Sequence, residues 1–196
     1  MDSIARPAFN VMLHGYYEAA FGPTILTVND YLRKQGIDPE MAAAHAGIVS
    51  GFHCSFGGDG LFRFDPDGEP CLVFEVLDED AATVIDLCAF AVAAPERFGT
   101  AMGNAPALGL ANITNAASWA FGTVMPIHRT PLGWLRDGGR GVVILDHRHA
   151  PAALGRALGK ILAEDEAHAL SLRGTLCRPP VDPANIIFKS SARRAA

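Results

Sequence analysis

The sequence Gly141-Val142-Val143-Ile144-Leu145 decides the fold of the C-terminal half of this chain. It is a continuous apolar run rich in β-branched residues, which is typical of a strand buried on both faces of a sheet. Strands of this kind occur mainly in parallel sheets, where helices cover both faces. The stretch therefore predicts a parallel strand–helix unit in this part of the chain.

The segments on either side of this strand agree with that prediction. Residues 124–127 predict an extended strand near a sheet edge, because their proline cannot donate a ladder hydrogen bond. Thr130-Pro131 is typical of an N-cap followed by a first-turn proline, and Gly138-Gly139 ends the short helix that they begin. After the central strand, Pro151 opens one long helix that continues to about Arg173. The order predicts a strand–helix–strand–helix unit with a right-handed parallel crossover.

The first 50 residues are predicted to be helical. Phe9 to Phe21 carries aromatic residues and leucine at helical spacing. Thr27 and Asp30 resemble a capping box that begins a second helix. Asp38-Pro39 supplies the N-cap and the first-turn proline of a third, shorter helix.

Residues 51–121 predict an antiparallel β-meander with connecting helices. Strands at Leu61–Phe64 and Cys71–Leu77 flank Asp65-Pro66-Asp67-Gly68, a sequence typical of a tight turn. Thr83–Phe90 forms the next strand. The predicted fold class is α+β in one compact domain. Its parts are a helical segment (1–50), the meander region (51–121), the strand–helix–strand–helix unit (122–189) and a flexible tail (190–196).

Composition excludes several classes of protein. Of the 196 residues, 49% are hydrophobic and 19% are charged, which is enough apolar surface for a core and argues against wholesale disorder. No apolar run reaches the roughly 18 residues that span a bilayer, and the N-terminus lacks a signal-peptide pattern. We therefore expect a cytoplasmic protein that does not contact membranes. The cysteines have neither metal-site nor redox-motif spacing and are predicted to be reduced and structural; they are Cys54, Cys71, Cys88 and Cys177.

The net charge of −5 hides a strong asymmetry along the chain. Nine acidic residues and one basic residue lie between Asp59 and Asp86, a local charge of −8, whereas six basic and two acidic residues between Pro126 and Lys160 give +4. Solvated surface is the simplest interpretation of both regions. Arginine also binds phosphate in a bidentate manner, so the basic half predicts a surface for nucleic acid or phosphate. The candidate residues are Arg129, Arg136, Arg140 and Arg148.

A second candidate site follows the central strand. Asp146, His147 and His149 are residue types that bind divalent metals, and they come at the carboxyl end of a strand, where α/β sheets bind ligands. The alternative is that Asp146 caps the next helix. Glu164 and His168 share one face of the predicted long helix, but a straight helix would keep them about 20 Å from its own start. They are therefore predicted to lie outside this site.

Three segments, in this order, resemble the catalytic core of bacterial replicative primases and related phage or plasmid primase-like proteins. They are residues 31–37 (YLRKQGI, similar to the helical "YL…RGI" element), residues 72–78 (LVFEVLD, similar to the "FPI-D" strand) and residues 124–162, whose layout is similar to a Toprim unit. A Toprim site holds magnesium with a Glu after its first strand and a D-x-D after a later one. Here His128 and Arg129 stand at the Glu position, and only Asp146 remains of the D-x-D. The resemblance implies a catalytically silent, primase-like domain.

The function predicted from these features is that of a non-enzymatic accessory protein of a bacterial mobile element. It would bind nucleic acid or a nucleic-acid-handling protein through its arginine-rich C-terminal half, without a cofactor. Two alternatives stay open. One is a metal-dependent hydrolase or phosphotransferase with a divalent metal at Asp146, His147 and His149, and the other is a protein-binding inhibitor acting through the acidic meander.

Overall fold

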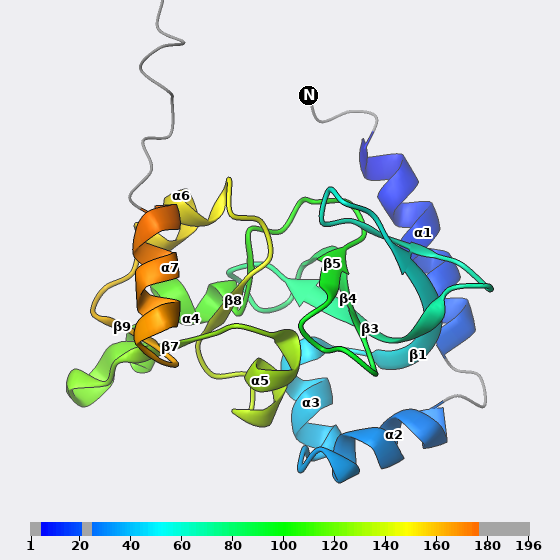
Figure 1. The fold of residues 1–196 in the computed structure, drawn as a ribbon, viewed down its shortest axis with the longest axis horizontal. Coiled ribbons are helices and arrows are strands. Elements are labelled where there is room, and N and C mark those ends of the chain that lie inside the picture. Colours follow the sequence, from blue (N-terminus) through cyan, green and yellow to red (C-terminus); the bar gives the residue numbers. More distant parts are fainter. Residues whose placement is uncertain (1–4, 21–24, 177–196) are drawn as a thin grey trace, which may run out of the picture.

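Two β-sheets with helices around them form the structure, a computed structural model that describes residues 5–20 and 25–176. A five-stranded antiparallel sheet and a four-stranded mixed sheet lie side by side, with α2 and α3 beside them (Figure 1). The arrangement confirms the predicted α+β class. None of the helices in the described residues combines the length and the apolar character that crossing a bilayer requires.

The N-terminal helices are present as predicted. They are α1 (Ala5–Ala20), α2 (Ile25–Lys34) and α3 (Pro39–Ala46). Asp38 caps α3, because its carboxylate accepts a hydrogen bond from the backbone N–H of Glu40 at 3.0 Å. The predicted capping box is wrong, since α2 already includes Ile25 and Thr27 therefore lies inside the helix.

The antiparallel sheet contains two strands that the sequence does not predict, at residues 49–56 and 98–100. Its strands are β1 (Val49–Phe56), β2 (Phe62–Phe64), β3 (Glu69–Leu77), β4 (Val84–Ala91) and β5 (Phe98–Thr100), in the order β2-β1-β3-β4-β5. Because β1 pairs with both β2 and β3, the predicted pairing of residues 61–64 with 71–77 is wrong. The turn at residues 65–68 carries the chain across β1. Gly68 permits this crossing, since a Cβ there would lie 2.4 Å from the carbonyl oxygen of Cys54.

The antiparallel sheet curls until its two edges approach each other. Thr100 of β5 donates a backbone hydrogen bond to the carbonyl of Gly60 at 3.1 Å, and it forms an isolated bridge with Leu61 just before β2. A Cβ on Gly99 would lie 2.6 Å from the same Gly60 oxygen, so glycine is needed where the edges meet. The result is a nearly closed small barrel, and α1 packs against it (Figure 1), with Tyr16 and Ala20 in the same core as Val73.

Helix α1 is anchored to the barrel by Tyr16, whose side chain is buried. The Tyr16 hydroxyl lies 2.5 Å from the carbonyl oxygen of Ile48 and 3.2 Å from that of Val73. Burial raises the pKa of Tyr16, so the hydroxyl keeps its proton and serves as a donor. The cysteines of the described region are buried free thiols, as predicted for structural cysteines, and Cys177 lies outside it; the buried ones are Cys54, Cys71 and Cys88.

We expect Tyr16→Phe to lower the free energy of unfolding by about 1–2 kcal/mol, because two buried carbonyls lose their hydroxyl donor. Tyr31→Phe is the matched control. Tyr31 is half-buried, and within the described residues its hydroxyl makes no hydrogen bond. We expect the free energy of unfolding to change by no more than about 0.5 kcal/mol. Urea unfolding followed by circular dichroism measures both. Equal losses in the two variants would contradict the anchoring role of Tyr16.

The mixed sheet is built around the strand that the sequence identifies most clearly. Its strands are β6 (Ala107–Leu108), β7 (Met125–His128), β8 (Val142–Ile144) and β9 (Ile161–Ala163), in the order β6-β8-β7-β9. Strands β7, β8 and β9 run parallel, and β6 is antiparallel to β8. The associated helices are α4 (Leu110–Thr114), the 3-10 segment η1 (Ala116–Gly122), α5 (Pro131–Arg136), α6 (Ala150–Leu154) and α7 (Glu166–Leu176).

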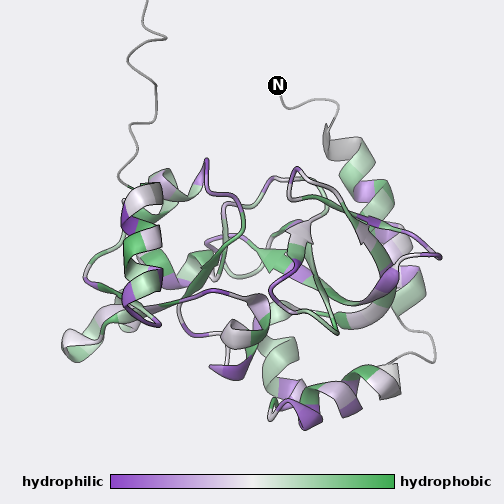
Figure 2. Ribbon diagram, in the orientation of Figure 1, coloured by the Kyte–Doolittle hydropathy of each residue, from purple (hydrophilic) through white to green (hydrophobic). Residues whose placement is uncertain are grey.

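Helices cover both faces of this sheet, as the buried strand β8 predicts. Leu132 and Trp134 of α5 share a core with Phe74 of the barrel, so the two sheets pack together through α5. Leu154 of α6 and Leu172 of α7 belong to a second core on the opposite face. Hydrophobic residues lie along the central strands of both sheets (Figure 2).

The predicted long helix from Pro151 to about Arg173 is wrong. Helix α6 ends at Leu154, β9 follows at residues 161–163, and α7 is a separate helix. Strand β9 pairs with β7, and the backbone N–H of Met125 donates to the carbonyl of Lys160 at 3.0 Å. Gly155 and Gly159 weaken a continuous helix, and pairing with β7 satisfies backbone groups that a helix would otherwise satisfy internally.

Candidate ligand site at the carboxyl edge of the parallel strands

The carboxyl ends of β7, β8 and β9 meet at one edge of the mixed sheet. The chain moves from β7 to β8 on one side and then returns to β9 on the other side of β7. Such a reversal of strand order creates a crevice between β7 and β9, outside their carboxyl ends. Open α/β sheets bind their ligands in crevices of this kind. The residues at or just after the strand ends are His128-Arg129, Asp146-His147 and Glu164-Asp165.

A cavity of about 370 Å³ opens at this edge, and we call it the carboxyl-edge pocket. Its polar lining includes three histidines and one arginine, and the rest is largely apolar, which is the usual make-up of a small-ligand site. The polar residues are His128, Arg129, His147, His168 and Ser171; the apolar ones include Phe98, Ile127, Ile144 and Leu172.

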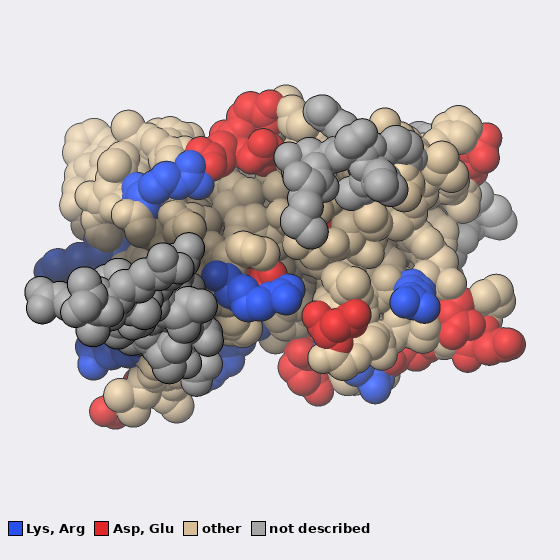
Figure 3. Space-filling model, turned by 90° about the horizontal axis from the view of Figure 1, so that it is seen from above, with Lys and Arg blue, Asp and Glu red and all other residues tan. Residues whose placement is uncertain are grey.

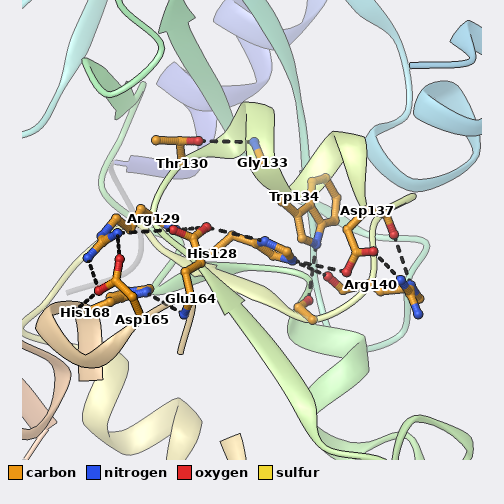
Figure 4. A network of polar contacts seen from close by, with 11 residues as sticks. His128, Arg129, Thr130, Gly133, Trp134, Asp137, Arg140, Glu164, Asp165 and His168 are labelled. Carbon is orange, nitrogen blue, oxygen red and sulfur yellow. Dashed lines mark hydrogen bonds and ion pairs between the residues drawn. The ribbon is translucent and has the colours of Figure 1, made fainter. Parts of the chain in front are cut away.

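Arg129 is the most strongly held polar residue of the pocket. Its guanidinium binds the Asp165 carboxylate in a bidentate manner, at 2.6 and 2.7 Å. Its backbone N–H donates to Oε1 of Glu164 at 3.1 Å. The hydrogen bond from Arg129 is the main reason that the pKa of Asp165 falls to about 2. Two carboxylates that follow β9 therefore bind Arg129 at the end of β7 (Figure 4).

His128 lies between acidic residues on both sides of its ring (Figure 4). Nε2 lies 3.1 Å from the carbonyl oxygen of Arg140, which can only accept, so this nitrogen carries a proton. Oδ2 of Asp137 is 3.5 Å from Nε2, and Oε1 of Glu164 is 3.7 Å from Nδ1. These contacts fix the orientation of the ring, and its side chain is only 11% exposed.

His168 is fixed by the turn that begins α7. Its Nδ1 accepts a hydrogen bond from the backbone N–H of Glu164 at 3.3 Å, so its proton resides on Nε2 in the neutral form. The backbone N–H of His168 donates to Oδ1 of Asp165 at 2.8 Å. Burial, together with nearby Arg129, lowers the pKa of His168. At neutral pH this residue is therefore a neutral Nε2–H donor.

Asp146 binds its sequence neighbours Arg148 and His149. Oδ1 and Oδ2 of Asp146 accept hydrogen bonds from the Arg148 guanidinium at 3.1 and 3.0 Å, and Nδ1 of His149 lies 2.8 Å from Oδ2. Burial by itself raises the pKa of Asp146, but the hydrogen bonds from Arg148 and His149 outweigh it and bring the pKa to about 2. Across residues 5–20 and 25–176, no group of three or more His, Cys, Asp or Glu side chains is placed to hold a metal ion. The geometry gives no support to the alternative of a metal at Asp146, His147 and His149.

Each of the four candidate arginines is paired within the protein. Arg129 and Arg148 follow the carboxyl ends of β7 and β8, whereas Arg136 and Arg140 come at and after the end of α5. Arg136 binds the side chain and carbonyl of Gln35, and Arg140 binds Asp137. All four therefore have acceptors within the protein. On the upper face of the molecule, acidic side chains lie beside basic ones near the centre of the view (Figure 3).

The acidic meander is also largely engaged within the protein. Glu75 and Asp86 are buried, and Glu69 and Glu79 form ion pairs with Arg97 and Arg156. The carboxylates in the turns accept hydrogen bonds from nearby backbone N–H groups; these are Asp59, Asp65, Asp78 and Asp80. The run of negative charge in the sequence thus mostly serves turns and ion pairs.

A larger cavity, of about 470 Å³, lies between the end of β3 and the segment before α4. Its charged lining consists of Asp78, Glu79 and Arg156, and the Glu79–Arg156 pair is closed at 2.5 Å. Arg156 is paired with Glu79, and Asp78 adds a negative charge, so the described lining of this cavity offers no free cation. The carboxyl-edge pocket is therefore the better candidate for an anionic ligand.

Sequence reasoning identifies part of the carboxyl-edge pocket and misses the rest. Arg129 and His147 are predicted site residues that line it, whereas Asp146 and His149 bind each other. Glu164 and His168 lie at the site because β9 replaces the middle of the predicted helix. The glycines Gly155 and Gly159 are the available signal for that break.

Comparison with known proteins adds no relative: no protein-family model, no curated protein and no solved structure matches the chain.

Proposed function

We propose that the protein is a non-enzymatic accessory protein that binds the phosphate group of a nucleotide or of a nucleic-acid end in its carboxyl-edge pocket. The observation that carries the proposal is the convergence of His128, Arg129, His147 and His168 at the reversal of strand order. This retains a role in nucleic-acid handling and assigns the phosphate contacts to a single pocket.

The donors of the pocket suit a phosphate. A guanidinium has five N–H donors, and the bidentate contact of Arg129 with Asp165 uses two of them. The Nε2–H of His168 is a further donor, and each histidine that gains a proton adds positive charge. The apolar wall, including Ile127 and Ile144, offers contact area for the sugar or base attached to the phosphate.

The same contacts support binding without catalysis. The carboxylates nearest to the pocket, Glu164 and Asp165, are held by the backbone and the guanidinium of Arg129. The pKa of Asp165, at about 2, makes it a very weak base. Asp146 is held in the same way by Arg148. Neither Asp165 nor Asp146, whose pKa also falls to about 2, is poised to accept a proton at neutral pH.

We expect Arg129→Gln to weaken binding of a 5′-phosphorylated oligonucleotide by about 10- to 100-fold, because charge-assisted hydrogen bonds to the phosphate are lost. Arg136→Gln is the matched control, since Arg136 has the same charge but binds Gln35 away from the pocket; a change of less than about twofold is expected. Isothermal titration at about 50 mM salt measures both affinities.

Three ligands distinguish the sources of the phosphate: a mononucleotide, the 5′-phosphorylated oligonucleotide and the same oligonucleotide with a 5′-hydroxyl. Equal affinity for the first two indicates a free nucleotide, and a preference for the second indicates a strand end. His147→Gln, at an exposed position, tests the pocket without breaking the Arg129–Asp165 pair. The proposal fails if none of the three ligands binds at about 1 mM, or if the 5′-hydroxyl oligonucleotide binds as tightly as the phosphorylated one.

A further inference from the structure

The outer edge of β9 is open in the described part of the chain. β9 is the last strand in the order β6-β8-β7-β9, and its only strand partner there is β7. Strand edges with unpaired N–H and C=O groups are templates for pairing with another strand, and proteins blunt them with short strands, charged side chains, proline or bulges. The sequence Ile161-Leu162-Ala163 contains no proline, and its register with β7 is regular.

Exposed apolar side chains surround this edge. Leu162 is 55% exposed and Leu158, just before the strand, is 63% exposed. Segment η1 lies beside the start of β9 (Figure 1), because Trp119 packs over Gly159, where a Cβ would lie 2.8 Å from the indole ring. At the end of this segment Phe121 is fully exposed, with a φ of 57°, a conformation unfavourable for an aromatic residue. Contact with solvent does not offset the cost of exposing these apolar side chains, whereas burial against a partner surface would.

We propose that a second copy of the chain pairs with β9, so that two β9 strands run antiparallel across a two-fold axis at Leu162. In this register Lys160 of each copy lies opposite Glu164 of the other, and Ile161 lies opposite Ala163. Opposite charges directly across an antiparallel pair stabilise it, and the two-fold axis repeats the Lys–Glu pair at both ends. This charge complementarity between the residues that flank β9, Lys160 and Glu164, identifies a second copy as the occupant.

The side chains available agree with this register. Residues 160, 162 and 164 point to one face of the strand, so the two charge pairs flank the central leucines. Lys160 is exposed, and the Glu164 side chain keeps 36% of its surface exposed despite its contact with Arg129. Three paired residues bury too little surface for a stable dimer, so Leu158 and Phe121 must supply further contact area around the strands.

The proposal predicts a reciprocal pattern of assembly in the full chain, measured by sedimentation velocity from about 1 to 100 μM. The wild type is expected to form dimers. Lys160→Glu and Glu164→Lys are each expected to weaken the dimer at least tenfold, because each places like charges opposite one another at both ends. An equimolar mixture of the two variants is expected to form heterodimers. In the mixed pair, the introduced carboxylate of one variant faces the introduced ammonium of the other, and the unchanged Glu164 faces the unchanged Lys160 across the axis.

Lys34→Glu, at the exposed end of α2, is the control for the same change of charge away from β9 and is expected to leave the dimer unchanged. Leu162→Lys, which places two ammonium groups at the axis, is a second disrupting variant that leaves Glu164 in place. A wild type that is monomeric at about 100 μM, an equal effect of Lys34→Glu, or a mixture that stays monomeric would each overturn the proposal. Thermal melting confirms that every variant compared is folded.

Discussion

Asp86→Ala is expected to lower the free energy of unfolding by about 3–5 kcal/mol, one of the two largest effects predicted for this protein. Asp86 lies on β4 and is fully buried. Its carboxylate accepts four backbone hydrogen bonds, at 2.7–3.1 Å, from residues near it in the chain and from the loop after β5. The donors are the N–H groups of Leu87, Ala101, Met102 and Asn104.

The loop held by Asp86 leads directly into β6, so this carboxylate fixes the connection between the two sheets. Alanine would leave several backbone donors unsatisfied in the interior, each of which is costly. Asp80→Ala is the control: Asp80 also accepts backbone hydrogen bonds in a turn, from Ala82 and Thr83, but it is exposed to solvent that can replace them. Guanidinium unfolding should show a much smaller loss for Asp80→Ala. Equal losses of unfolding free energy in Asp86→Ala and Asp80→Ala would show that the burial of Asp86 does not add to its contribution to stability.

The effect of Asp86→Asn should also depend on pH. Burial raises the pKa of Asp86, and the backbone N–H donors, first among them that of Asn104, only partly oppose this. A carboxyl whose pKa is higher in the folded state stabilises the protein below its unfolded pKa, and this contribution is lost as the pH rises through the folded value. The stability difference between wild type and Asp86→Asn should therefore be larger near pH 4 than near pH 7. A difference that grows with pH would contradict this assignment.

Gly141→Ala is expected to lower the free energy of unfolding by about 3 kcal/mol or more. Gly141 comes directly before β8 and has a φ of 73°, and a Cβ there would lie 2.0 Å from the carbonyl oxygen of Pro126 on β7. The clash is with backbone, so the two parallel strands would have to separate. The Gly141 carbonyl also accepts hydrogen bonds from Asn112 at 2.8 Å and from Trp134 at 3.2 Å, which ties α4 and α5 to this point.

Gly15→Ala provides the opposite control for the same substitution. Gly15 lies inside α1, and a Cβ there would meet nothing within 4 Å. Alanine is the better helix former, so this variant should be more stable than the wild type by about 0.5–1 kcal/mol. Melting temperatures of the two variants are expected to move in opposite directions. A neutral Gly141→Ala would mean that β7 and β8 approach each other less closely than the structure shows.

Several elements could be predicted from the sequence because their signals are local. The run at residues 141–145 identifies a strand covered on both faces, and β8 is buried as expected. Asp38-Pro39 predicts the start of α3, and Thr130-Pro131 predicts the start of α5. A cap or a buried strand depends on residues within a few positions of each other, so the sequence alone contains the necessary information.

Other elements depend on pairing with distant parts of the chain. Strand β9 has three residues, too few for a periodic pattern, and it forms because β7 offers a free edge. Strand β1 likewise depends on distant partners, since it lies between β2 and β3. Short apolar segments are compatible with helix or strand, and their long-range partners decide between the two.

The amino-acid sequence by itself determined the α+β class, the buried parallel strand and the concentration of arginine and histidine around its end. Only the tertiary structure decided what those residues do. Arg129 meets Asp165, 36 positions later, because β9 returns the chain to the edge of β7, and His168 reaches the pocket for the same reason. Charges that are far apart in sequence become partners or neutralise one another only when strand pairing places them together, and local patterns do not contain that information.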